Sequence, residues 1–578
     1  MLDLVFTNFL SINTAKSDFP LVSEDLYHPA LIINCDLVTT ERHINFPTAN
    51  NYRYNFKKAD FKNLYEYICN VDWSHINNFV QVDEALNEFY RILYEALDKF
   101  VPTYRCCTSN FPPWFTFEIK SNLKTKEYFR KKWIKTRQLT YYDEFKRLRT
   151  LIKNLVKAAY EEYIDKVENN IKSNPSEFWK YVNLKQGCSR IPGTVTANDI
   201  VYNKPHDIVN AFATVFSDFF TDSSSFDPNN DKLHNNHPSI TIGYITENDL
   251  ISLMSKLQNK NNCGVDKIPD FLIKDCRFIL AAPLSVIINL AIKTSTFPLL
   301  WKQTRIIPVH KKGDKSNVCN YRPIAILNNF SKLFEMIIYN TLLTHTRSFI
   351  SNDQHGYMTG RSTVTNLACF SQYVSEVIDN RGQVDAVYSD LSKAFDSIDH
   401  GLLLDKIGSF GTAPALLLLL SSYLSHRYCF VFYNGFSSFE FIATSGVPQG
   451  SNLGPLLFIL FINELLLSFT CPVLAYADDI KLFHSISSSS DAWVLQNNID
   501  KLVAWCKDNK LVINTNKCFI ITYTRKNNYV VHDYTVNNSI LTRTSSIRDL
   551  GVLFTSNFNF TQHIINICSS ASRTLGFI

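Results

Sequence analysis

The stretch Leu474-Ala475-Tyr476-Ala477-Asp478-Asp479-Ile480-Lys481-Leu482-Phe483 decides how this sequence is interpreted. Two short runs of β-type residues flank a pair of acidic residues, which predicts a hairpin with both carboxylates at its turn. Adjacent aspartates repel each other, and a divalent cation bound beside them would relieve that repulsion. The pair therefore predicts a metal site, although a pattern as short as Tyr-x-Asp-Asp is weak on its own.

A second acidic element lies upstream, where the segment from Val384 (VDAVYSD) predicts a strand that ends in Asp390 before a turn. An acid at a strand end is a typical metal position, because Mg²⁺ prefers a few carboxylates plus substrate phosphates to a full protein cage. Asp390 and Asp478 on neighbouring strands would hold two ions about 4 Å apart. The competing interpretation is that these acids are surface turn residues, as most aspartates are.

Two further segments predict contacts with a phosphorylated ligand. Residues 445–455 (SGVPQGSNLGP) lead into an apolar helix from Leu456, and their glycines would let the backbone approach a nucleotide closely. Residues 301–327 predict a strand, a basic turn and a second strand, whose cations would face one triphosphate: Arg305, Lys311, Lys312 and Arg322. The alternatives are a plain loop before a buried helix and a surface hairpin with solvated charges.

Seven segments follow one another in a fixed order: NYRPIAIL, HGYMTGRST, DLSKAFDSIDH, SGVPQGSNLGPLLF, YADD, KLVINTNKC and RDLGVLF. This ordered set resembles the successive motifs of non-LTR retrotransposon reverse transcriptases, and is most similar to the jockey group of insect elements. The resemblance is strong over residues 245–578. It extends more weakly through PPWF at 112–115 and NPSEFWKYVNLKQ at 174–186, which are similar to the connecting region of those elements.

The resemblance implies a role for each matching residue. Asp390 and Asp478 would be the metal ligands, with Asp479 as the companion acid. Phe395, five residues after Asp390, takes the place of an aromatic residue that excludes a 2′-hydroxyl, and core packing is its alternative role. The remaining assignments are nucleotide positioning by Gln449 and Gly450, triphosphate binding by Arg322 and one of Lys311 or Lys312, and protonation of pyrophosphate by Lys517.

The same resemblance implies the architecture and the partners. We expect an α+β right-hand polymerase with fingers and palm over 245–525 and a partial, helical thumb over 526–578. A mostly helical connecting region with basic patches (46–220) and a polar linker (221–244) would precede it. The implied reaction adds dNTPs to a DNA primer, in the family a nicked target DNA, on an RNA template, with Mg²⁺ or alternatively Mn²⁺ as the cofactor.

The N-terminal part of the chain carries two further predictions. Residues 1–45 are similar to the last strands of an apurinic-type endonuclease, with an altered signature at Asp25 and His28, so we expect no nicking activity. Spacings of three and four between Tyr141 and Ala159 predict one helix with an apolar stripe. About a dozen Lys and Arg lie between Glu118 and Lys157, interleaved with aromatic residues, and suit contacts with nucleic acid. A solvated helix face is the alternative.

Composition limits the class of protein. The 578 residues carry a net charge of only +5, so nucleic-acid binding would depend on local patches. The 14 cysteines show no zinc spacing, and free thiols in a reducing compartment are expected. The longest apolar runs are too short for a membrane helix, and no signal peptide is recognisable. We therefore expect an intracellular ribonucleoprotein component of the nucleus or cytoplasm that does not bind membrane, while the sequence does not indicate an oligomeric state.

Two alternatives to a reverse transcriptase stay open at this stage. An RNA-dependent RNA polymerase uses a similar acidic hairpin, although Phe395 and the YADD form argue against it. A truncated, non-catalytic nucleic-acid-binding relic is the second alternative, and the intact acids do not support decay at the site.

Overall fold

The computed structural model divides the chain into two compact units, Met1–Pro47 and Thr48–Ile578. It describes residues 12–16, 31–35, 52–105, 111–185, 191–224, 226 and 239–576. In the first unit, β1 (Ile12–Lys16) pairs antiparallel with β2 (Leu31–Cys35). Asp25 and His28, on which the nuclease prediction rests, lie outside the described residues. The predicted domain boundaries stay predictions.

The second unit begins with helices packed on the body of the fold. A short antiparallel pair, β3 (Tyr52–Tyr54) and β4 (Thr103–Arg105), brackets α1 (Phe61–Cys69) and α2 (Val82–Phe100). The inner face of α2 is fully buried at Phe89 and Tyr90, which lie at ring distances of 5.3 and 6.0 Å from Phe330. Because Phe330 belongs to α11 (Asn329–Thr346), more than two hundred residues away in sequence, these first helices share a core with the later part of the chain.

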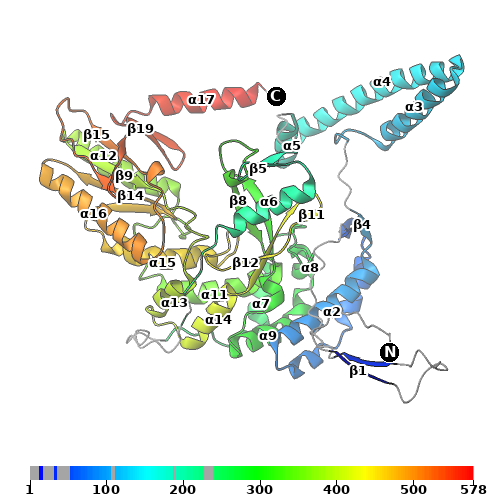
Figure 1. Cartoon of the computed structure of the whole chain (residues 1–578), viewed down its shortest axis with the longest axis horizontal. Helices are drawn as coiled ribbons and strands as arrows, with labels where there is room; N and C mark the ends of the chain where they lie inside the picture. The colour runs from blue at the N-terminus through cyan, green and yellow to red at the C-terminus, as the bar shows by residue number, and fades with distance from the viewer. Residues whose placement is uncertain are drawn as a thin grey trace. The chain divides into compact units, whose positions relative to one another are not determined.

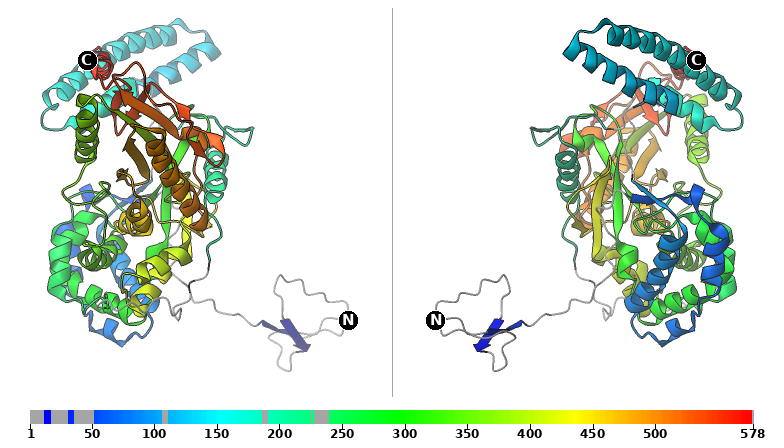
Figure 2. Two further views of the ribbon diagram at one scale, coloured as in Figure 1. Left: turned by 90° about the vertical axis from the view of Figure 1, so that its left-hand side faces the viewer. Right: turned by 90° about the vertical axis from the view of Figure 1, so that its right-hand side faces the viewer.

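Two long helices, α3 (Phe117–Thr136) and α4 (Leu139–Asn169), form an antiparallel hairpin and are followed by α5 (Pro175–Lys185). They lie side by side in every view (Figures 1 and 2). The left-handed conformation of Arg137, with φ +55°, ends α3. The helix predicted from the stripe between Tyr141 and Ala159 is confirmed as part of α4.

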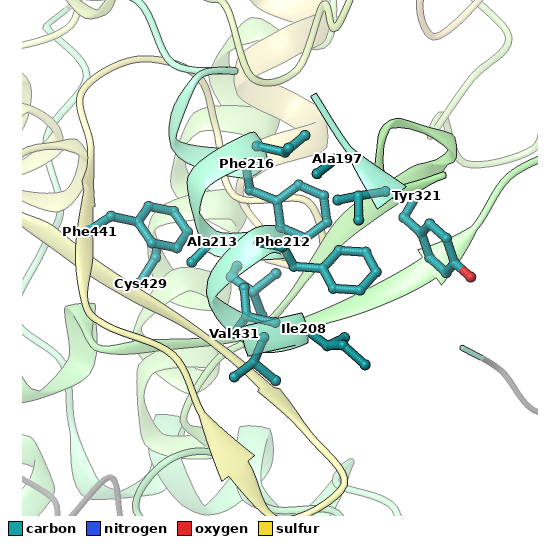
Figure 3. Packing of buried hydrophobic residues seen from close by; sticks show 14 of the residues in the cluster. Ala197, Ile208, Phe212, Ala213, Phe216, Tyr321, Cys429, Val431 and Phe441 are labelled. Carbon is teal, nitrogen blue, oxygen red and sulfur yellow. The ribbon is translucent and has the colours of Figure 1, made fainter. Parts of the chain in front are cut away.

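The first of the two larger sheets has the strand order β11-β10-β7-β8, with β12 also paired to β10. Its strands are β7 (Thr304–His310), β8 (Tyr321–Ile326), β10 (Arg427–Tyr433), β11 (Phe436–Ser437) and β12 (Phe441–Ala443). The helix α6 (Pro205–Ser217) packs Phe212 and Phe216 onto this sheet, where Tyr321, Val431 and Phe441 receive them (Figure 3). The small pair β5 (Val195–Ala197) and β6 (Ile200–Tyr202) adds to the same core.

The second larger sheet has the order β13-β14-β9-β15-β18. Its strands are β9 (Gln383–Ser389), β13 (Val473–Tyr476), β14 (Asp479–Ser485), β15 (Phe519–Thr524) and β18 (Thr542–Arg543). The central strand β9 is buried on both faces, including the polar residues Gln383 and Asp385. On one face, Phe370 and Val374 of α12 (Thr363–Asp379) pack against Ala386 and Ile521. The helix α16 (Ser489–Asp508) packs along β14.

The remaining helices surround the two sheets. They are α7 (Glu247–Ser255), α8 (Asp270–Asp275), α9 (Arg277–Lys293), α10 (Leu299–Lys302), α13 (His400–Gly408), α14 (Pro414–Leu424) and α15 (Gly454–Ser468). The apolar helix predicted from Leu456 is confirmed as α15, which is buried on nearly all sides because it has almost no polar face. Among the described residues, no helix has both the length and the apolar character that a membrane crossing requires. The chain is thus a mixed α and β protein.

The C-terminal part differs from the expected helical thumb. Residues 535–555 form the short strands β16 (Thr535–Val536), β17 (Ser539–Ile540), β19 (Ser546–Asp549) and β20 (Val552–Thr555) in addition to β18. In the part of the chain described after residue 525, up to residue 576, only α17 (Thr561–Leu575) is helical. The cause is a buried anchor on β9, since the Asp385 carboxylate accepts hydrogen bonds from Tyr534 at 2.9 Å and Thr522 at 2.8 Å and lies 3.8 Å from Arg543.

Candidate active site

The predicted acidic hairpin is confirmed as β13–β14. Tyr476 pairs with Asp479, which leaves Ala477 and Asp478 at the turn. Ala477 has φ +57°, a left-handed conformation that costs a residue other than glycine roughly 1–2 kcal/mol. The surrounding structure must therefore hold this turn in place.

Two residues at the start of the HGYMTGRST motif supply that support: Gln354, which precedes it, and Gly356 within it. The buried side chain of Gln354, just before the motif, accepts a hydrogen bond from the Ala477 N–H at 3.0 Å and donates to the Ala477 carbonyl at 3.4 Å. Gly356 lies so close that a Cβ there would be 2.3 Å from the Ala477 nitrogen, so only glycine fits. The motif was visible in the sequence, but its role as a clamp on the acidic turn was not.

Asp390 follows directly on β9, as predicted from the strand-end pattern. Because Ser389 pairs with Ile480 on β14, Asp390 and Asp478 lie next to each other at the same end of their strands. Burial raises the pKa of Asp478, and the negative charge of Asp390 raises it further, whereas Lys311 and Arg322 lower it. Two carboxylates that destabilise each other's charge are suited to a divalent cation.

Lys517 forms an ion pair with Asp390, with 3.0 Å between Nζ and Oδ2. The backbone fixes the same relationship, because the Asn514 N–H donates to the Asp390 carbonyl at 2.9 Å and Asn514 precedes the short 3₁₀ helix Thr515–Lys517. The ammonium group therefore occupies the side of Asp390 where a cation would bind.

Asp479 behaves differently from the other two acids. Its side chain is exposed and is not among the described residues that line the cleft. Partial burial of the turn, then the charges of Asp478 and Asp390, raise the pKa of Asp479 to about 6. Within the described ranges, no three His, Cys, Asp or Glu side chains gather closely enough to hold a metal ion. The structure thus brings Asp390 and Asp478 together in the cleft but leaves Asp479 outside it, because Asp479 begins the strand β14 beyond the turn. The role of Asp479 as a third metal ligand stays a prediction.

The predicted strand, basic turn and strand is confirmed as the β7–β8 hairpin, in which Val309 pairs with Arg322. Lys311, Lys312 and Arg322 all line the cleft. Arg305 does not, which corrects the expectation that it faces the same ligand. Arg305 lies at the start of β7, four residues before Val309, and its guanidinium donates to the Cys263 carbonyl at 3.0 Å.

The loop that carries Gln449 and Gly450 is pressed against β8. The Ala325 N–H donates to the Gln449 carbonyl at 2.7 Å. Gly450 has φ +122°, and a Cβ at this position would lie 2.4 Å from the Ala325 carbonyl oxygen. Any larger residue would push the loop away from the strand. The close backbone approach expected of this glycine is therefore an approach to Ala325 of β8 within the protein.

Phe395 is half-buried, and its ring both packs in the core and faces the cleft. Its ring stacks on Phe458 of α15 at 4.4 Å with 11° between the planes, and its other neighbour is the edge of Tyr357 at 6.2 Å. It also lines the cleft. The ring is therefore held rigidly by core packing at the wall of the cleft, which is the condition a steric gate requires.

One open cleft of about 610 Å³ joins these parts. Nine of the eleven residues predicted for the site line it: Lys311, Lys312, Arg322, Asp390, Phe395, Gln449, Gly450, Asp478 and Lys517. The sequence interpretation missed Tyr357, Lys393, Asp396 and Asn514, which line it as well. Each of these four lies within or next to a quoted motif, so proximity to a motif was the available signal.

Comparison with known families shows that residues 309–554 match the family described as reverse transcriptase (RNA-dependent DNA polymerase). The chain contains a reverse transcriptase domain. Every predicted site residue except Arg305 falls inside this domain.

Curated relatives agree with this assignment. The chain is 27% identical over 478 residues to a probable RNA-directed DNA polymerase from transposon BS of Drosophila melanogaster, covering 78% of this chain and 52% of the relative. It is 28% identical to the RNA-directed DNA polymerase from mobile element jockey of Drosophila funebris, covering 56% of this chain and 36% of the relative. The chain thus spans about half the length of the first relative and about a third of the second. A solved telomerase from Candida albicans covers 44% of this chain and 46% of its own with a TM-score of 0.31, too low to support an argument.

Proposed function

We propose that this chain is an RNA-directed DNA polymerase that adds dNTPs to a DNA primer on an RNA template. The observation that carries the proposal is the meeting of Asp390 and Asp478 with Lys311 and Arg322 in one cleft inside the reverse transcriptase domain. Two strand-end carboxylates suit a divalent cation, and a facing pair of cations suits a triphosphate. The cleft therefore combines the two requirements of nucleotidyl transfer.

Asp390 and Asp478 would hold Mg²⁺, with Mn²⁺ as the alternative ion. The mutual effect of their charges supports this fit, because a bound cation would offset the repulsion that raises the pKa of Asp478. When bound, such ions make a primer hydroxyl a better nucleophile and stabilise the departing pyrophosphate. Lys517, which pairs with Asp390 in this structure, would exchange that carboxylate for the pyrophosphate oxygens and donate a proton there.

The arrangement that fits this function is a right hand. The sheet β13-β14-β9-β15-β18 would be the palm, since it bears both acids, and the β7–β8 hairpin with its neighbours would belong to the fingers. The C-terminal α17 would begin the thumb. We keep the proposed boundaries of 245–525 for fingers and palm and 526–578 for a partial thumb.

The α3–α4 hairpin supports nucleic-acid partners for the proposed enzyme. Its lysines and arginines lie on exposed helix faces, and only some of them form ion pairs within a helix, such as Arg130 with Glu127 and Arg147 with Glu144. Lys132 lies 5.0 Å from the Tyr128 ring and 5.2 Å from the Tyr141 ring, which joins the two helices. A basic surface of this kind attracts the phosphate backbone of RNA or of primer DNA.

Primer extension tests the proposal. The purified chain is given a labelled DNA primer on an RNA or a DNA template, with dNTPs or rNTPs, in the presence of Mg²⁺ or of a chelator. We expect extension with dNTPs on RNA that the chelator abolishes. Preferential extension with rNTPs would support an RNA polymerase instead, and template binding without any extension would support a non-catalytic relic. Asp508→Asn, at the exposed end of α16, is the control for Asp478→Asn.

A further inference from the structure

Asp396, the residue after Phe395, is a buried carboxylate at the wall of the cleft. It is only 6% exposed. One side of it lines the cleft and the other lines a small, mostly apolar cavity shared with Pro448 and Gln449. Its Oδ2 accepts a hydrogen bond from Gln449 Nε2 at 3.0 Å. A buried carboxylate at this place needs an explanation, because burial of a charge is costly unless the group has a partner.

The backbone around Asp396 is already fixed without its side chain. The Ser445 hydroxyl donates to the Asp396 carbonyl at 2.7 Å, and the Val447 N–H donates to the Phe395 carbonyl at 2.7 Å. A Cβ at Gly446 would lie 2.6 Å from the Asp396 Cα. Since these contacts hold the loop in place, the carboxylate is not needed to anchor the chain. The carboxylate instead contacts the Gln449 side chain.

Burial brings the pKa of the Asp396 carboxyl group close to neutral pH. Burial raises the pKa of Asp396 to about 7, while the Gln449 hydrogen bond and the charge of Lys393 lower it. Arg427 lines the small cavity, but it donates to the Tyr423 carbonyl at 2.9 Å. Cys429 on the same wall has a pKa raised by burial to about 12 and stays neutral. His400, beyond Gly446, bonds the Gly446 carbonyl at 2.8 Å.

We infer that Asp396 is a positioning residue that fixes the orientation of the Gln449 carboxamide and thereby sets which of its atoms the incoming nucleotide meets. An ionised carboxylate is only an acceptor, so the amide nitrogen must turn toward it and the amide oxygen must face the cleft. A protonated Asp396 would instead donate to the amide oxygen, and the NH₂ group would then face the cleft. This inference rests on the proposed polymerase function and deepens it by adding a second determinant of nucleotide binding beside Phe395.

A swap of the two partners tests the inference. In Asp396→Leu the amide loses its partner, and we expect the KM for dNTP to rise roughly tenfold with a smaller change in kcat, as for loss of a charge-assisted hydrogen bond. Gln449→Glu places two carboxylates together and should be at least as impaired. The double variant Asp396→Asn/Gln449→Glu restores a donor facing an acceptor and keeps an oxygen toward the cleft. We expect its KM to return to within a few-fold of wild type.

The pH profile separates positioning from simple packing. For wild type we expect the KM for dNTP to rise as the pH falls from 8 to 6, because protonated Asp396 reverses the amide. Asp396→Asn has no titrating group at this position, so its KM should lack that part of the dependence. A double variant no better than Gln449→Glu alone, or identical pH profiles for wild type and Asp396→Asn, would overturn the inference.

A wild-type chain that extends no primer would refute the proposed function, and the pairing would then be judged by stability. Asp396→Leu, Gln449→Leu and the double variant Asp396→Leu/Gln449→Leu are compared by melting temperature. If the two residues are partners, the double variant is less destabilised than the sum of the single changes. Additive shifts would overturn the inference independently of activity.

Discussion

The cleft and the α3–α4 hairpin are built on opposite principles. In the cleft, groups far apart in sequence hold one another, as Gln354 holds Ala477 and Asn514 holds Asp390. In the hairpin, the ion pairs join residues three or four apart on one helix. Of all side chains on α3 and α4, only Ile119, Leu148, Ile152 and Val167 are buried. The cleft is therefore a rigid site, whereas the hairpin is a charged surface with little core.

This contrast predicts two kinds of mutational response. A change of one atom in the cleft should alter chemistry or selectivity strongly, because its neighbours cannot rearrange. A change of one charge on the hairpin should have a small effect, because phosphate contacts are additive and tolerate displacement. The predictions below test that contrast in order of their expected effect on primer extension.

The largest effect is expected from Asp478→Asn. The substitution keeps the shape of the turn but removes one of the two carboxylates that would bind the cation. Extension should fall by more than the 10- to 100-fold typical of losing an outer partner of a metal ligand. RNA binding measured by filter retention should persist, because the hairpin is unchanged. Extension at the rate of the Asp508→Asn control would refute the assignment of Asp478.

A smaller but specific effect is expected from Phe395→Val. The ring is clamped by Phe458 and Tyr357, so it cannot move aside for a 2′-hydroxyl. Removing it should change the ratio of dNTP to rNTP incorporation efficiency on the order of a hundredfold or more, at least the upper part of the roughly 1–3 kcal/mol that a methylene contributes in an apolar pocket. Some dNTP efficiency should also be lost with the ring packing. An unchanged ratio in an active, folded variant would assign Phe395 to core packing alone.

A moderate effect is expected when the hairpin loses charge. Replacing Arg130, Lys131, Lys132 and Lys135 with glutamine should weaken RNA binding and reduce the slope of log affinity against log salt by up to about 3, since each phosphate contact on a single strand contributes about 0.7. The control replaces four exposed lysines elsewhere: Lys57, Lys58, Lys62 and Lys260. If both variants lose the same affinity and slope, the hairpin is only a solvated face.

The sequence predicted those parts of the site that depend on local pattern. The acidic turn, the strand end at Asp390 and the β7–β8 hairpin follow from residues adjacent in the chain. What it could not predict depends on pairs distant in the chain. The clamp by Gln354, the side of β7 that Arg305 faces and the partnership of Asp396 with Gln449 are set by tertiary packing, which no periodicity encodes.

The same reason explains the strands after residue 525. Tyr534 and Arg543 are drawn to the sheet by Asp385, a buried acid on another strand. The predicted linker shows the effect again, because Ser224 donates to Asp399 at 2.9 Å through its backbone N–H, and Asp399 in turn forms a 2.6 Å ion pair with Lys510.

The last prediction concerns stability and should leave extension unchanged at saturating substrate. Asp266 is fully buried and joins the first helices to the body, since the Tyr90 hydroxyl donates to it at 3.1 Å and its own N–H donates to Asn328 at 3.1 Å. Burial raises the pKa of Asp266 to about 7. Between about pH 4 and 7 the folded chain therefore keeps a proton that the unfolded chain has released.

Folding thus binds a proton in this window, and the stability contributed by Asp266 falls as the pH rises through it and levels off above pH 7. The cost above pH 7 is on the order of a few kcal/mol. Asp266→Asn carries no titrating group, so its melting temperature relative to wild type should rise by a few degrees between pH 5 and pH 8, at roughly 1 °C per kcal/mol for a chain of this length. Comparison with Asp508→Asn, an exposed acid, removes the general effect of pH. A difference that stays constant across this range would mean that Asp266 is ionised throughout, which would refute the prediction.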